Sequence, residues 1–251
     1  MQTFVKSLEQ TAGMKSSFTL PVTGLMHQIS EEEVDYGLSV LRESILAFER
    51  AKGIPAEHSK AEMPFFRQDS RVLVGPEIGL FMLPLYERLV ERPLDKEPTL
   101  VLSLDYQALG EHCLFENLSL LPTKTEKEPI VRHFMAQLET EYDKFFYDAE
   151  NTGFTYDSRF FSLLCNACLE IKRPQPNTLK EWRLAALRSP EEASYRYEQG
   201  NLVPFIPIEL PMTCLKQVYL EDYQKQPLLY GTLNGFLKSK GLPAEQLLNL
   251  T

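Results

Sequence analysis

Cysteine is scarce in this sequence, and no long apolar run occurs. Four cysteines in 251 residues are too few for a disulfide framework in a chain of this size. The first residues lack the apolar core of a signal peptide, and no later stretch approaches the roughly 18 uninterrupted apolar residues of a membrane span. We therefore expect a soluble cytoplasmic protein with reduced thiols and no membrane partner.

Positive charge is also in short supply. The chain has 26 lysines and arginines against 35 aspartates and glutamates, which gives a net charge of −9 at pH 7. Nucleic-acid binding draws most of its strength from a basic surface. Here the basic residues form pairs such as Arg67 with Arg71, or Lys172 with Arg173. Nucleic acid is therefore not the main partner we expect.

Recognised catalytic and metal-binding patterns are missing as well. The histidines have neither H-x-x-x-H nor H-x-H spacing, and the sequence contains no Walker loop and no G-x-S-x-G. Cys165 and Cys168 have C-x-x-C spacing, but zinc takes about four ligands and no second pair exists. In a segment as apolar as FFSLLCNACL, two buried thiols are the favoured interpretation. We expect neither a metal nor a cofactor. Glu170 and Lys172 match the Glu-x-Lys spacing of metal-dependent nucleases, which is common by chance.

Apolar spacing and capping residues predict five helices. Ser30 precedes the first, with Glu33 at the capping-box position, and Thr125 stands in the same relation to Glu128 before the third. Gly241 ends the last helix. The expected helices are residues 31–52, 78–90, 125–149, 156–171 and 228–240.

Short β-branched or apolar runs predict the strands. Gln199, Gly200 and Asn201 predict a hairpin between two of them. Pro204 and Pro207 lie inside one strand, and because proline donates no ladder hydrogen bond, we expect that strand at an edge or with a bulge. The expected strands are residues 71–74, 99–105, 118–121, 181–188, 194–198, 202–210 and 215–220.

These elements predict an α/β or α+β fold. We expect a mixed sheet with an antiparallel C-terminal meander, packed by two or more long amphipathic helices. No internal repeat or linker divides the sequence, so residues 1–251 are expected to form a single domain. Residues 1–16 are interpreted as a loosely attached N-terminal arm.

Residues 172–220 contain KRPQPNTLKEWRLAAL, then SYRYEQGNLVPFIPIELP, then LKQVYL. This segment resembles the C-terminal half of the bacterial domain of unknown function 2971 family, whose members carry a Lys-His pair and a Glu-x-Glu-aromatic-Arg strand. Lys172, Glu181, Trp182 and Arg183 match that pattern, whereas Arg173 replaces the histidine and Leu179 the first glutamate. The resemblance implies an α/β fold and little chemistry, because the family has no assigned function.

Glu181 and Arg183 are the strongest candidate site residues. Two positions apart on a strand, their side chains project from one face while Trp182 projects from the other. If the strand 194–198 pairs with this one, Arg196 and Tyr195 join them. A carboxylate between guanidinium groups stays ionised and can orient a ligand or act as a base. The alternative is a structural ion pair that fixes the register of the strands.

Two classes of function remain open at this stage. The first is a binding or regulatory module that recognises a small anionic ligand or a protein partner through Glu181, Arg183 and Arg196. The second is an enzyme acting on a nucleotide, by cleavage or ADP-ribosyl transfer, with Glu181 as its essential carboxylate and Arg183 on a phosphate. A pocket that holds Glu181 with aromatics such as Tyr195 favours the enzyme. If arginine occupies the Glu181 carboxylate and no cavity adjoins it, the enzyme hypothesis is excluded.

Overall fold

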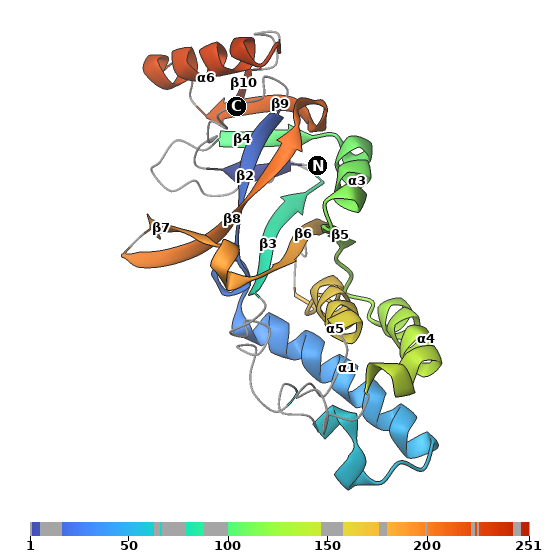
Figure 1. Ribbon diagram of the computed structural model, residues 1–251. Helices are drawn as coiled ribbons and strands as arrows, with labels where there is room; N and C mark the ends of the chain where they lie inside the picture. Colours follow the sequence, from blue (N-terminus) through green and yellow to red (C-terminus); the bar gives the residue numbers. More distant parts are fainter. Residues whose placement is uncertain are drawn as a thin grey trace.

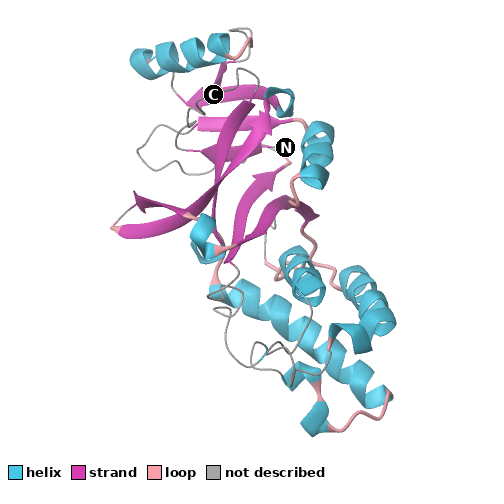
Figure 2. Cartoon of the chain, viewed as in Figure 1, coloured by secondary structure: helices cyan, strands magenta, loops and turns pink. Residues whose placement is uncertain are grey.

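The computed structural model contains one large sheet with helices on both of its faces (Figure 1, Figure 2). It describes residues 2–5, 17–62, 66, 79–87, 100–146, 158–175, 180–198, 200–221, 224, 226–242 and 247–250. The helices are α1 (Glu31–Ala51), α3 (Tyr106–Phe115), α4 (Glu128–Phe145), α5 (Ser158–Glu170) and α6 (Pro227–Ser239). None of these helices combines the length and the hydropathy needed to cross a membrane.

Ten strands of the described residues form the sheet. They are β1 (Gln2–Val5), β2 (Ser17–Gly24), β3 (Gly79–Tyr86), β4 (Leu100–Leu104), β5 (Ser119–Pro122), β6 (Glu181–Arg188), β7 (Ser194–Glu198), β8 (Asn201–Pro211), β9 (Leu215–Glu221) and β10 (Leu247–Leu250). Their order is β10-β9-β4-β1-β3-β2-β8-β7, and β6 pairs with β3 and β5. The sheet is mixed, because β9 and β10 are parallel and the other strand pairs are antiparallel. The α/β class is confirmed.

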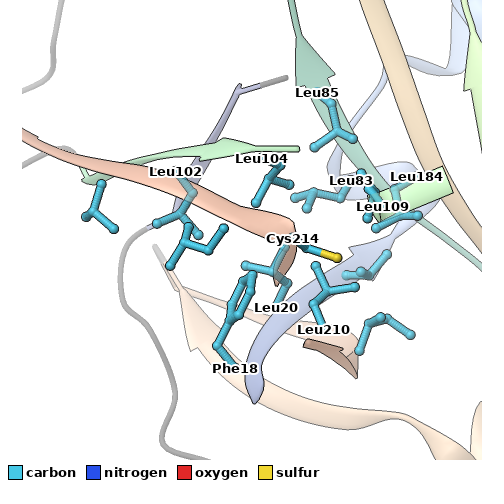
Figure 3. Packing of buried hydrophobic residues seen from close by; sticks show 14 of the residues in the cluster. Phe18, Leu20, Leu83, Leu85, Leu102, Leu104, Leu109, Leu184, Leu210 and Cys214 are labelled. Carbon is cyan, nitrogen blue, oxygen red and sulfur yellow. The ribbon is translucent and has the colours of Figure 1, made fainter. Parts of the chain in front are cut away.

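Two apolar cores lie on opposite faces of the central strands. In β6, Leu184 and Ala186 belong to one core and Ala185 to the other, as the alternation of side chains along a strand requires. The first, here called the sheet core, packs the sheet against α3 and α6; Figure 3 shows part of it. The second, here called the helix core, packs β3, β5 and β6 against α1, α4 and α5. Odd-numbered residues of β6 therefore face the helix core.

The predicted helix 78–90 is wrong, because residues 79–86 form strand β3. Both faces of β3 are buried, so the run GLFMLPLY has no period-two pattern, and such a strand resembles a buried helix in sequence. Pro84 fits because it pairs with Arg183 on one side only. On the other side, β2 pairs with Phe81 and Met82, and β1 with Tyr86.

Helices α1, α4, α5 and α6 agree closely with the prediction, whereas the sequence analysis does not predict α3. Ser30 accepts a hydrogen bond from the Glu33 backbone N–H at 3.3 Å, which confirms the first cap. The predicted start of the third helix is corrected: α4 begins at Glu128 after Lys127 and carries Pro129 in its first turn. Proline fits there because the first helical N–H groups have no intrahelical partner. The predicted strand 71–74 lies outside the described residues.

The two prolines in the interior of β8 each occupy a place where the strand has one neighbour, and a third, Pro211, is its last residue. Pro204 lies opposite Tyr195 of β7, and Pro207 lies opposite Pro21 of β2. Within β8 only Phe205 is paired on both sides, with Ser194 and with Thr23. Proline in a sheet is expected where one side of the strand has no partner strand. Pro204 and Pro207 both meet this expectation, although β8 as a whole lies between β2 and β7.

The expectation of a loose N-terminal arm is corrected for residues 2–5. They form β1, which lies between β4 and β3 in the sheet and pairs with β4 along its whole length, from Gln2 to Val5. The backbone hydrogen bonds of a strand with neighbours on both sides fix these residues. In the C-terminal part, β7 and β8 form the predicted hairpin, whereas β6 and β9 pair with earlier strands.

Candidate functional site

Glu181 and Arg183 lie at the start of β6. They project into the helix core, because the odd-numbered residues of β6 face that core. Arg183 is 1% exposed and Glu181 is 9% exposed. Arg183 Nε donates to Glu181 Oε1 at 2.9 Å, and Arg183 Nη1 donates to the Leu169 carbonyl at the same distance. Trp182 faces the sheet core. The centroids of its indole ring and of the Tyr106 ring lie 5.0 Å apart, in an edge-to-face arrangement.

Two further charged side chains complete a buried ion network of Glu33, Lys172, Glu181 and Arg183. Lys172 Nζ donates to Glu181 Oε2 at 2.5 Å, and Arg183 Nη2 donates to Glu33 Oε1. The network holds two positive and two negative groups, so no net charge is left inside it. It connects the sheet at β6 with the start of α1 and the end of α5.

The pKa values of the network agree with a structural role. Burial opposes ionisation of Glu181, but Arg183 and Lys172 outweigh it and hold the pKa of Glu181 below its usual value. Burial likewise opposes the charge on Arg183, and Glu181 and Glu33 raise the pKa of Arg183 above its usual value. A carboxylate with a lowered pKa and two occupied oxygens is a poor general base near neutral pH.

The structure does not bring Arg196 and Tyr195 to Glu181. Both lie on β7, which pairs with β8 and not with β6. Arg196 instead lies over the Phe205 ring at 5.3 Å, donates to Thr23 Oγ1 at 3.2 Å and lies 3.2 Å from a Glu198 oxygen. The expected grouping is corrected because the short helical turn at Pro190–Glu192 carries the chain away from β6 before β7 begins.

Tyr195 belongs to a different feature, an exposed apolar surface at the tip of the hairpin. Tyr195 is 57% exposed, Tyr197 77% and Leu202 63%. Tyr197 lies opposite Leu202, and Tyr195 lies opposite Pro204, so the four side chains share one face. We call these four residues the hairpin patch. Figure 1 shows the hairpin of β7 and β8 projecting from the sheet.

A groove of about 370 Å³ lies between α4 and α5. Its polar residues include His133 and Gln137 from α4, and Asn166 and Glu170 from α5. Burial raises the pKa of Glu170 above its usual value, against the opposing charges of Lys124 and His133. Glu181 is not among the residues that line this groove, nor among those that line a groove beside Pro207 and Glu209 or one beside Ser158 and Ser189.

The cysteines lie in the protein interior. Cys165 and Cys168 are fully buried thiols in the helix core, and burial raises the pKa of Cys168 to about 12. Such thiols are poor nucleophiles and poor metal ligands at neutral pH. Within the described residues, no group of three or more histidine, cysteine, aspartate or glutamate side chains is arranged to hold a metal ion.

No family model, no curated protein and no solved structure matches this chain. The resemblance of residues 172–220 to the domain of unknown function 2971 family therefore stays a prediction.

The sequence reasoning missed the hairpin patch and the groove as sites. Tyr195 was named for its nearness to Glu181, whereas its surroundings are Tyr197, Leu202 and Pro204. The alternation of tyrosines in SYRYE next to NLVP was a usable signal, because a hairpin places such residues on one face. The groove had no comparable signal, because it depends on how two separate helices pack.

Proposed function

We propose that this protein is a binding module for a partner protein, and that the partner adds an extended segment to strand β7. One observation carries the proposal: the hairpin patch lies on β7, which ends the strand order and, among the described strands, pairs with β8 alone. The sequence left open a module that binds either a small anionic ligand or a protein partner. We propose the protein partner. This proposal locates the interaction at Tyr195 and Tyr197 rather than at Glu181, and we expect it to take place in the cytoplasm.

The edge of β7 offers main-chain hydrogen bonds to a partner. Within the described residues β7 pairs with β8 alone and ends the strand order. In an antiparallel pair, every second residue turns its N–H and C=O groups away from the neighbouring strand. Such an edge is a template for an added strand, which gains affinity from the backbone and specificity from alternate side chains.

The hairpin patch continues the core-facing side of β8. Ile206, Ile208 and Leu210 lie on one face of β8 and are buried in the sheet core. Leu202 and Pro204 have the same parity and therefore lie on the same face, but Leu202 is 63% exposed. An apolar surface that extends beyond the core is a feature of interaction sites, and tyrosine is enriched at the centres of interfaces.

Charge indicates a basic partner. Residues 190–198 contain three glutamates and one arginine, a net charge of −2, within a chain of net charge −9. Arg196 is already engaged by Thr23 and Phe205, and the faces of Tyr195 and Tyr197 attract lysine and arginine side chains. We therefore assign the partner segment as an extended strand with basic residues at alternate positions. A second copy of this acidic chain lacks that complementarity.

The test is a selection of random displayed peptides, each long enough to span β7, on the full-length protein. We expect enrichment of extended sequences that alternate lysine or arginine with apolar residues. Tyr197→Ala should weaken binding of an enriched peptide by about tenfold, the effect of losing one central aromatic contact. N-methylation of the peptide should abolish binding at every second position only, because only alternate N–H groups meet β7.

Phe115→Ala provides the matched control, because Phe115 is an exposed aromatic residue on α3, 85% accessible. Helix α3 meets β8 at Glu209, near the end of β8 that lies opposite to the hairpin patch. The Phe115→Ala variant should bind the enriched peptide as the wild type does. Three results would reject the proposal. The first is a selection that enriches no peptide for the wild type over a Tyr195→Ala, Tyr197→Ala double variant, and the second is equal binding of an enriched peptide by Tyr197→Ala and the wild type. The third is sedimentation of the wild type as a dimer that Tyr197→Ala dissociates.

A further inference from the structure

The groove between α4 and α5 is lined by polar and apolar side chains. His133 and Gln137 lie one turn apart on α4 and share a 2.8 Å hydrogen bond. Asn166 and Glu170 lie one turn apart on α5, and the apolar residues Leu163 and Ala167 of α5 also line the groove. A volume of about 370 Å³ is within the range that small organic ligands occupy in proteins.

Glu170 is the exceptional residue of this groove. Its backbone carbonyl accepts from Lys124 N–H at 2.8 Å, but its carboxylate has no hydrogen bond and no ion pair within the described part of the chain. The carboxylates of Glu181 and Glu49, by contrast, are buried. Glu181 is held by Lys172 and Arg183, and Glu49 accepts from Lys60 N–H at 2.7 Å and from Tyr142. The Glu170 residue is only partly buried and lines the groove, so a donor from outside the chain can reach its carboxylate.

We propose that this groove binds a guanine base, whose N1–H and N2–H groups donate to the two carboxylate oxygens of Glu170. A carboxylate accepts two parallel hydrogen bonds well from a group with two adjacent donors. Guanine presents that pair on one edge. Asn166 and Gln137 carry amide groups that donate to the guanine O6 and N7 acceptors, and Leu163 and Ala167 contact the flat base.

The charges around Glu170 favour a neutral ligand over a guanidinium cation, which presents a similar pair of donors. Lys124, before α4, and His133, on α4, act on the Glu170 carboxylate electrostatically. A cationic ligand would meet repulsion from the ammonium group of Lys124. Guanine has the two donors without the charge. This site is separate from the hairpin patch and does not depend on partner binding there.

Calorimetric titration of the full-length protein with guanosine, inosine and adenosine tests the proposal. We expect guanosine to bind, and inosine, which lacks the N2 amine, to bind about tenfold more weakly, as the loss of one hydrogen bond to a charged group implies. Adenosine should not bind. Glu170→Gln should weaken guanosine binding by about tenfold or more. Glu139→Gln, an exposed α4 glutamate outside the groove, should leave it unchanged.

Thermal unfolding gives a second measurement on Glu170→Gln that does not involve the ligand. Because burial raises the folded-state pKa of Glu170, its charged form destabilises the fold as pH rises through that pKa. Glu170→Gln should therefore melt higher than wild type at neutral pH and equal to it in acid, which also shows that the variant folds. Equal guanosine affinity in wild type and Glu170→Gln, tighter binding of free arginine than of guanosine, or no nucleoside binding by wild type would each overturn the proposal.

Discussion

At the scale of single residues, the buried ion network decides what Glu181 does. Its two oxygens are occupied by Lys172 and Arg183, and Arg183 also reaches Leu169 and Glu33. A buried pair contributes little net stability relative to apolar residues, but removal of one partner leaves an uncompensated buried charge. The network therefore makes the contact between sheet and helices depend on each of its members.

Glu181→Gln should lower the free energy of unfolding by roughly 3 kcal/mol at pH 7, because Lys172 and Arg183 lose their shared anion. The folded-state pKa of Glu181 is lowered, so its stabilising effect is present above the usual glutamate pKa and is lost as pH falls through the lowered value. The free energies of unfolding of wild type and variant, measured by urea titration across this pH range, should become equal in acid.

Glu191→Gln is an exposed control and should change the free energy of unfolding by less than about 0.5 kcal/mol. An equal effect of Glu181→Gln and Glu191→Gln would contradict the structural role.

The sequence predicted part of this site. The spacing of Glu181 and Arg183 correctly placed them on one face, and a structural ion pair was one of the two interpretations. Their burial was not predictable, because it depends on Glu33, which is 150 positions from Arg183 along the chain. Nothing near Glu181 in the sequence indicates that α1 and α5 cover that face of β6.

At the scale of elements, one glycine sets the distance between α1 and α5. A Cβ at Gly37 would lie 2.8 Å from Cys168 Sγ and 2.9 Å from the Cys168 carbonyl oxygen. The thiol can rotate, but the carbonyl belongs to the α5 backbone and moves only with the helix. The close packing of these helices therefore requires glycine at position 37.

Gly37→Ala should destabilise the protein by about 2 kcal/mol, the usual cost of overpacking a well-packed contact. Adding Cys168→Ala should restore part of the loss, because it removes the sulfur contact and leaves the carbonyl contact. Gly231→Ala is the matched control: no atom lies within 4 Å of its added Cβ, and on helix α6 it should stabilise by about 0.5 kcal/mol or more. Denaturant unfolding measures all three, and a neutral Gly37→Ala would show that the two helices are not in close contact.

The elements themselves were largely predictable where one face is solvated. The residues of α1 and α4 alternate between buried and exposed positions with a clear helical period, and caps such as Ser30 mark an end. Strand β3 was not predictable as a strand, because both of its faces are buried and the sequence carries no period. The tolerance of Pro84 inside β3 was not predictable either, because it depends on where β1 and β2 end.

At the scale of the whole molecule, the order of the strands determines which surfaces remain open. Neighbours in sequence suggested that β6 and β7 lie side by side, but β3, β2 and β8 separate them in the sheet. This order buries Glu181 at the centre and leaves Tyr195 at an edge. Long-range strand pairing is not encoded in local sequence patterns, so the position of the hairpin patch at an edge of the sheet could be found only in the folded molecule.

The most direct test of partner binding at β7 is amide hydrogen exchange of the full-length protein with and without a selected peptide. An added strand protects alternate amides of β7 by new main-chain hydrogen bonds, so slower exchange between Ser194 and Glu198, and unchanged exchange in α4 and α5, is the predicted result. Peptide binding that leaves β7 exchange unchanged, or that protects a different surface, would contradict the account.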